Sequence, residues 1–234
     1  MPEVWFARHG ECIANVGEAT LHAWEAPLTP RGYEQARCIA AYLQDWAGDR
    51  QVKVITSSYR RATETAKTVY EAFHERTSQK RSFETWKKVK EFNCLSLPAG
   101  KRTTAAERSH LVAEFWQRGD PMFTHGGKTE SFDAFISRVQ GVLRRLGEFQ
   151  EDQLVVVFSH HLFIQAVEWL IEGKMKGTSP QREEMSDFYQ MLKRRDKAVP
   201  NGAIVQTHLN QARRKLLNLQ TSHLTDIMLP VAPR

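Results

Sequence analysis

The strongest constraint on the fold is a unit that recurs along the chain: a short apolar run, a polar tip and then a segment with helical spacing. Residues 4–7, 52–56 and 154–158 have the length and composition of buried strands. Each run ends in polar residues and is followed by apolar residues at intervals of three and four, which indicate amphipathic helices. This alternation is typical of a parallel sheet with helices on both faces. We therefore predict an α/β fold, a single-domain three-layer sandwich with a mostly parallel central sheet.

The start of the first helix can be predicted from its sequence. Thr29 can cap the first free amides, Pro30 suits the first helical position, and Gly48 follows the last apolar residue. Further helices are predicted at residues 62–73, 105–117, 131–149, 162–172 and 183–194, and further strands at 203–207 and, on an edge, 215–220. Residues 83–92 could form either a strand or an extended segment.

The 234 residues contain neither an internal repeat nor a linker, so one domain is expected over residues 1–225. Residues 93–129 are rich in glycine and proline and have little regular pattern, which favours a lid insertion over the functional site. The last residues, 226–234, are expected to form a disordered tail.

Composition places the chain among globular proteins, with 41% hydrophobic and 26% charged residues. No apolar stretch is long enough to span a bilayer, and the N-terminus lacks the pattern of a signal peptide, so a cytoplasmic location is expected. The three cysteines, Cys12, Cys38 and Cys94, are too few and too scattered for a disulfide framework or a zinc site.

The net charge of +6 and the calculated pI of about 9.3 suit an anionic ligand without requiring one. The basic residues are dispersed along the chain rather than gathered in a stripe with interleaved aromatic residues. We therefore expect neither a nucleic-acid nor a membrane partner.

Polar clusters follow three of the predicted strands: Arg8-His9, Arg60-Arg61 and His160-His161. By themselves, Arg8 to Glu11 could equally form an ordinary polar turn. However, the carboxyl ends of parallel strands meet at one edge of a sheet, so these clusters should converge. Arginines around two histidines suit a tetrahedral oxyanion such as phosphate. One neutral imidazole could then attack phosphorus while a nearby carboxylic acid protonates the leaving alkoxide.

The order of motifs resembles that of the histidine phosphatase superfamily, also called phosphoglycerate-mutase-like. Its opening Arg-His-Gly-Glu and the following asparagine match residues 8–11 and Asn15, and its Val-x-Ser-His-Gly element aligns on residues 157–161. Between them lie counterparts of its Leu-Thr-x-x-Gly-x-x-Gln-Ala, Ser-x-x-x-Arg-Ala-x-x-Thr-Ala and Gly-Glu-Ser motifs, at residues 28–36, 57–66 and 129–131. The resemblance extends over about residues 4–207, through a late Asn-Gly turn and strand.

The resemblance implies a role for each matching residue. His9 would be the nucleophile that forms a phosphohistidine, Arg8 and Arg61 would bind the phosphoryl oxygens, and His160 would stabilise the transferring group. Asn15 would contribute a further donor. Glu91 stands where the family has its proton donor.

Two positions depart from the family pattern. The Phe-Gly-x-x-Glu-Gly sequence expected after the acid is replaced by Asn-Cys-Leu-Ser-Leu at residues 93–97, so Glu91 could instead be a surface carboxylate. His161 replaces a glycine; it could bind substrate, or it could cap the following helix. A metal site at His160-His161 is disfavoured because adjacent side chains on a strand end diverge.

The resemblance implies a metal-independent phosphomonoester hydrolase that uses a phosphohistidine intermediate and no cofactor. The substrate would be a small phosphorylated molecule or a phosphoprotein. Alternatives are a mutase that returns the phosphoryl group to a sugar acid and a phosphate-binding or scaffold protein without turnover. The sequence does not indicate an oligomeric state.

Overall fold

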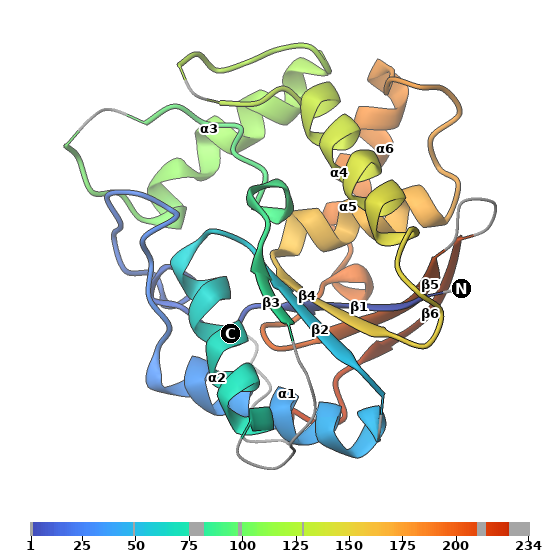
Figure 1. Cartoon of the computed structure of the whole chain (residues 1–234). Helices are drawn as coiled ribbons and strands as arrows, with labels where there is room; N and C mark the ends of the chain where they lie inside the picture. The colour runs from blue at the N-terminus through green and yellow to red at the C-terminus, as the bar shows by residue number, and fades with distance from the viewer. Residues whose placement is uncertain are drawn as a thin grey trace.

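The computed structural model describes residues 2–48, 50–74, 82–97, 100–127, 129–209 and 214–224. Its centre is a six-stranded sheet in the order β3-β2-β4-β1-β5-β6 (Figure 1). The strands are β1 (Glu3–Arg8), β2 (Val52–Thr56), β3 (Ser82–Thr85), β4 (Leu154–Ser159), β5 (Ile204–Leu209) and β6 (Arg214–Gln220). Strands β1 to β4 run parallel, while β5 is antiparallel to both β1 and β6. The predicted mostly parallel sheet, with residues 215–220 on an edge, is confirmed.

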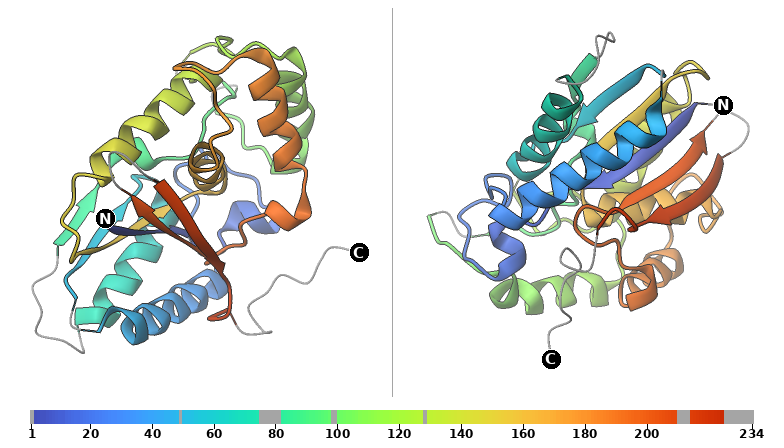
Figure 2. Two further views of the ribbon diagram at one scale, coloured as in Figure 1. Left: turned by 90° about the vertical axis from the view of Figure 1, so that its right-hand side faces the viewer. Right: turned by 90° about the horizontal axis from the view of Figure 1, so that it is seen from below.

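The sheet is covered on both faces, as predicted (Figure 2). Alternate residues of β1 separate into two cores, because successive side chains of a strand point to opposite faces. Trp5 and Ala7 pack with α1 (Pro30–Ala47) and α2 (Arg60–His74). Val4 and Phe6 join a larger core with α3 (Ala105–Arg118), α4 (Phe132–Leu146), α5 (His161–Ile171) and α6 (Arg182–Leu192). Every residue of β4 is buried, as expected for a central strand.

The predicted helix starts agree with the capping contacts. The Thr29 side chain accepts a hydrogen bond from the Gly32 amide, and Pro30 occupies the first helical position. Ser131 likewise caps α4 through the Ala134 amide. The prediction for α4 was too long at its C-terminus: the helix ends at Leu146, before Gly147, rather than at residue 149.

The segment at 83–92, left open between strand and extended chain, divides into two parts. Only Ser82–Thr85 pairs in the sheet, and a short 3-10 helix, η2 (Lys87–Val89), follows it. Two further 3-10 helices complete the elements of the described residues, η1 (Ile13–Val16) and η3 (Arg195–Lys197). The predicted tail at 226–234 lies outside the described residues, and so do parts of the predicted lid, residues 98–99 and 128.

The part of the predicted lid that is described packs against the loop after β1. Thr20 and Thr103 exchange two backbone hydrogen bonds of 3.0 and 3.1 Å. Within the described chain, no helix has the length and apolar character needed to cross a membrane.

Candidate active site

Strand register brings the two predicted active-site histidines together. Arg8 of β1 pairs with Ser159 of β4, so His9 and His160 lie immediately beyond the carboxyl ends of adjacent strands. The His9 amide donates to the Ser159 carbonyl at 3.1 Å, and the two imidazole centroids are 5.2 Å apart. His9 is 3% exposed and His160 is fully buried.

Hydrogen bonds define the state of the His9 ring. Nδ1 lies 2.7 Å from the Gly10 carbonyl oxygen, which can only accept, so Nδ1 carries the proton. Nε2 is therefore the acceptor of the 2.8 Å hydrogen bond from Arg61 Nε. Burial, followed by the charges of Arg61 and Arg8, lowers the pKa of His9 well below its usual value. At neutral pH the ring is uncharged, and its lone pair is on the atom that faces Arg61.

The two arginines predicted to bind phosphate both lie beside His9. Arg61, in the first turn of α2, is 7% exposed and also donates from Nη1 to the Ala23 carbonyl at 2.5 Å. Arg8 donates from Nη1 to the Val199 carbonyl at 2.6 Å, while its buried Nε has no hydrogen-bond partner. Burial lowers the pKa of Arg8 to about 10, which still leaves the guanidinium charged at neutral pH.

His160 is held from the end of β2. Its Nε2 is 2.8 Å from Ser57 Oγ, and the Tyr59 ring packs against the imidazole at a centroid distance of 5.0 Å. Its buried Nδ1 has no partner. Burial, with the charge of Arg61 as the next cause, lowers its pKa well below the usual value, so His160 is neutral.

Glu91 is not a surface carboxylate. It is partly buried after η2, and its Oε1 accepts hydrogen bonds from the amides of Phe92 (3.0 Å) and Phe163 (3.2 Å). Oε2 accepts from the Leu162 amide at 3.3 Å. The carboxyl group thus caps the N-terminus of α5, directly after His160. Burial raises the pKa of Glu91, although the charge of Arg61 opposes this shift. A raised pKa favours the protonated acid.

The structure rules out one of the two alternatives for His161, the helix cap, while substrate binding stays a prediction. The N-cap residue of α5 is His160, and the free amides of that helix turn to Glu91, so His161 is not the cap. Its buried Nδ1 lacks a partner. Burial, followed by the Arg8 charge, lowers the pKa of His161 to about 4.

Asn15 is exposed, and its oxygen is committed to local contacts. Oδ1 accepts from the Cys12 amide at 3.0 Å and from Asn201 Nδ2 at 3.3 Å. Only the Nδ2 group of Asn15 remains to donate to a substrate. Asn201 also donates to the His9 carbonyl at 3.0 Å, which links the late Asn-Gly turn to the loop that begins at His9.

Several residues that support the site were quoted in motifs but given no predicted role. Thr65 accepts from the Gly10 amide and donates to the Arg61 carbonyl, at 3.0 and 2.7 Å. Gly10 and Gly32 are needed for close backbone contact, because a Cβ on Gly10 would lie 2.3 Å from the Gly32 carbonyl oxygen. Both glycines and the threonine occupy fixed positions in the quoted motifs, and this was the sequence signal that could have indicated their supporting roles.

Three buried nitrogens in this cluster have no hydrogen-bond partner: Arg8 Nε, His160 Nδ1 and His161 Nδ1. Unsatisfied buried polar atoms are costly, and a ligand rich in oxygen acceptors would pair with them. In the described part of the chain, no three His, Cys, Asp or Glu side chains are grouped so that they could hold a metal ion. The cluster of two guanidinium groups, neutral imidazoles and one carboxyl group is suited to phosphoryl transfer.

Comparison with known families supports this chemistry. Residues 4–186 match the model of the histidine phosphatase superfamily, branch 1. The chain belongs to the histidine phosphatase superfamily. Adenosylcobalamin/alpha-ribazole phosphatase of Salmonella typhi is 31% identical over 166 residues, which cover 67% of this chain and 73% of that protein. Its counterpart in Escherichia coli K12 is 31% identical over 163 residues, with coverage of 67% and 72%. Because these relatives are phosphatases, the chain is classed as a phosphatase too.

Solved structures agree on the fold. A putative alpha-ribazole-5′-P phosphatase from Escherichia coli has a TM-score of 0.66 at 24% identity, covering 94% of this chain and 96% of that one. Phosphoserine phosphatase from Entamoeba histolytica, in complex with 3-phosphoglyceric acid, has a TM-score of 0.66 at 17% identity, covering 96% and 100%. The three-layer architecture expected from the sequence is that of these phosphatases.

Proposed function

We propose that the chain hydrolyses phosphomonoesters through a phosphohistidine on His9, without a metal ion. The observation that carries the proposal is the state of the His9 ring. Its Nδ1–H is bound to the Gly10 carbonyl, so the lone pair is on Nε2 and can attack phosphorus once Arg61 Nε turns away from it. The low pKa of His9 keeps this lone pair unprotonated at neutral pH.

In the first step, His9 Nε2 forms a bond to phosphorus as the bond from phosphorus to the ester oxygen breaks. Arg61 turns its Nε–H from His9 to a phosphoryl oxygen, and Arg8 binds another oxygen with its unpaired Nε. His160 Nδ1 and His161 Nδ1, both buried and without a partner, would bind the phosphoryl group as well, and Asn15 Nδ2 would approach from the exposed side.

Glu91 supplies the proton that the leaving alkoxide needs. The raised pKa of Glu91 favours the acid form before the reaction, and the amides at the start of α5 stabilise the carboxylate that remains. In the second step that carboxylate takes a proton from water, the water oxygen bonds to phosphorus, and the phosphorus–nitrogen bond breaks. Free phosphate leaves and His9 is restored.

The 31% identity to adenosylcobalamin/alpha-ribazole phosphatases makes an alpha-ribazole phosphate the first substrate to try. A panel should add sugar phosphates, nucleotides, phosphoglycerates and a phosphopeptide. Transfer of the phosphoryl group from one carbon of a phosphoglycerate to another, rather than to water, would indicate the mutase instead.

The test is turnover of a generic aryl phosphate by wild type and by His9→Ala, each with and without a chelator. We expect the wild type to be active in both conditions and His9→Ala to lose at least about 10³-fold in kcat. His110→Ala, on the exposed side of α3, is the matched control and should retain full activity. Retained turnover in His9→Ala, or loss of wild-type turnover with the chelator, would contradict the proposal. Phosphate binding without any turnover would indicate a binding protein.

A further inference from the structure

A cavity of about 340 Å³ lies between the loop that follows β1 and the segment that follows Glu91. Residues 21–24 line it together with Asn93, residues 95–97, Gly127 and Thr129. Its volume falls in the range of small-molecule sites in proteins. Leu21, Leu95 and Leu97 make much of the lining apolar, so the cavity suits an uncharged portion of a ligand better than a phosphate group.

The cavity adjoins the proposed reaction centre on two sides. Ala23 lines it, and the carbonyl of Ala23 is the acceptor for Arg61 Nη1 at 2.5 Å. Asn93 also lines the cavity and lies two residues beyond Glu91, the proposed proton donor. Since the proton must reach the leaving oxygen, the alcohol portion of the ester would occupy this side of the site.

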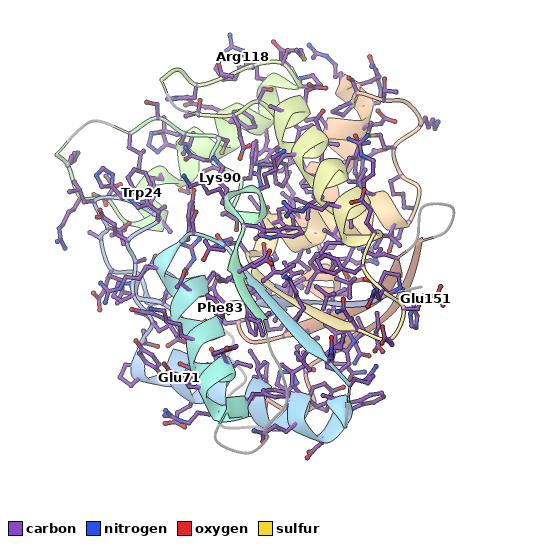
Figure 3. All side chains as sticks on the ribbon, viewed as in Figure 1. Trp24, Glu71, Phe83, Lys90, Arg118 and Glu151 are labelled. Atoms are coloured by element: carbon purple, nitrogen blue, oxygen red, sulfur yellow. The ribbon has the colours of Figure 1, made fainter. Side chains whose placement is uncertain are left out.

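Two stacked rings form part of the wall. His22 and Trp24 lie 4.2 Å apart, centroid to centroid, with an angle of 7° between their planes. Both residues line this cavity and also a second cavity of about 690 Å³, so the two rings lie between the two cavities. Trp24 remains 47% exposed, although a tryptophan gains most by burial. In Figure 3, Trp24 lies at the left, where the loop after β1 meets the segment before α3.

Backbone hydrogen bonds fix the loop that carries these rings. The Trp24 carbonyl accepts from the Arg60 amide at 2.9 Å, next to the phosphate-binding Arg61. The His22 carbonyl accepts from the Glu25 amide at 3.2 Å. These backbone hydrogen bonds hold the aromatic surface at a fixed distance from Arg61. A group attached to a phosphate bound at Arg61 could therefore contact the two rings.

We propose that Trp24, backed by His22, selects phosphomonoesters whose alcohol carries a planar aromatic ring, such as a nucleoside 5′-monophosphate. The ring stacks on the aromatic surface in the 340 Å³ cavity while the phosphoryl group binds between Arg61 and Arg8. The inference rests on the proposed phosphatase function, which it deepens by a substrate class. Stacking on aromatic side chains tolerates many ring types, so the class is defined by planarity rather than by one base.

The test compares two esters that differ only by the ring: adenosine 5′-monophosphate and ribose 5-phosphate. We expect wild type to prefer the adenosine ester in kcat/KM, and Trp24→Leu to lower that ratio about tenfold, the effect of losing one stacked base. Trp46→Leu, which removes a similarly exposed tryptophan from α1, is the control and should leave the ratio unchanged. Adenosine itself, titrated calorimetrically, should bind Trp24→Leu about tenfold more weakly than wild type.

An equal ratio of kcat/KM in wild type and folded Trp24→Leu, or equal adenosine affinity, would overturn the inference. Hydrolysis of both esters with no preference would refute the role of Trp24 and leave the phosphatase function intact. Failure of wild type to hydrolyse either ester or an aryl phosphate would instead refute the proposed function. In that event, adenosine titration still decides whether Trp24 binds a planar ring.

Discussion

Arg61 Nε donates a 2.8 Å hydrogen bond to His9 Nε2, the atom expected to attack phosphorus. A cation thus occupies the lone pair of the proposed nucleophile, and in the proposed mechanism an oxyanion draws the arginine away as a better acceptor. Burial and, after it, the charge of Arg61 lower the pKa of His9, and the hydrogen bond from Arg61 holds the ring in position. In the proposed mechanism this contact also couples exposure of the His9 lone pair to phosphate binding, because the guanidinium that leaves Nε2 is the one that binds the phosphoryl oxygens.

Arg61→Lys tests whether the several planar N–H donors of the Arg61 guanidinium are needed. Lysine keeps the charge but cannot donate to His9, Ala23 and a phosphoryl oxygen in one plane. We expect kcat/KM for an aryl phosphate to fall by about 10² or more, since a charge-stabilising donor is lost from the transition state. The adjacent Arg60→Lys is the control; Arg60 is exposed and pairs with Glu64, so its variant should stay within about twofold. Similar activity in both variants would argue against a special role for Arg61.

Glu91→Gln tests the proton donor through its dependence on the leaving group. The acid form of Glu91, favoured by its raised pKa, is required only when the leaving alkoxide is strongly basic. The variant should lose about 10²-fold or more on an alkyl phosphate and much less on p-nitrophenyl phosphate. In wild type, alkyl phosphate hydrolysis should decline as pH rises through the pKa of Glu91, and Glu91→Gln should lack this decline. Exposed Glu114→Gln is the control; an equal loss on both substrates would point to a structural role.

His161 should make the protein sensitive to acid. Its pKa is lowered to about 4 in the folded state, so the unfolded chain binds the proton first, and stability is lost as pH falls from about 6.5 towards 4. From these values, the wild type should lose about 2 kcal/mol more than His161→Asn between pH 7 and pH 5. Urea unfolding at both pH values measures the difference. Exposed His110→Asn should behave like wild type, and equal losses in wild type and His161→Asn would refute the shifted pKa.

Two glycine substitutions should have opposite effects on stability. A Cβ at Gly32 would lie 2.1 Å from the Glu11 carbonyl oxygen, so Gly32→Ala forces two backbones apart and should cost about 1–3 kcal/mol. Gly141 lies in α4 with nothing within 4 Å of an added Cβ, so Gly141→Ala should stabilise by about 1 kcal/mol. Thermal unfolding distinguishes them. A stable Gly32→Ala protein would mean that the loop at His9 tolerates displacement from α1.

Much of the fold could be predicted from local pattern. Thr29 and Pro30 mark the start of a helix by themselves, and the continuous apolar run of β4 is typical of a central strand. The segment that the sequence left open between strand and extended chain depends on tertiary contacts. The strand ends at Thr85, the 3-10 helix Lys87–Val89 follows, and Glu91 then contacts the start of α5, far away in the sequence.

The same distinction applies to the site. That Arg8, His9, Arg61 and His160 would converge follows from parallel strands and from family motifs, and the geometry brings them together. The environment of Glu91 could not be predicted, because its partners are backbone amides at Leu162 and Phe163, some seventy residues away. The roles of all these residues, the extent of the domain and a cytoplasmic location stay predictions.

Trapping the intermediate tests the central claim most directly. Wild type incubated briefly with a ³²P-labelled phosphomonoester and then denatured in base should carry label on His9, because phosphohistidine is stable in base and labile in acid. His9→Ala should carry none, and Glu91→Gln, in which water activation is impaired, should accumulate at least as much label as wild type when the leaving group is good. Turnover of the ester without any base-stable label on His9, or label on another residue, would contradict the account.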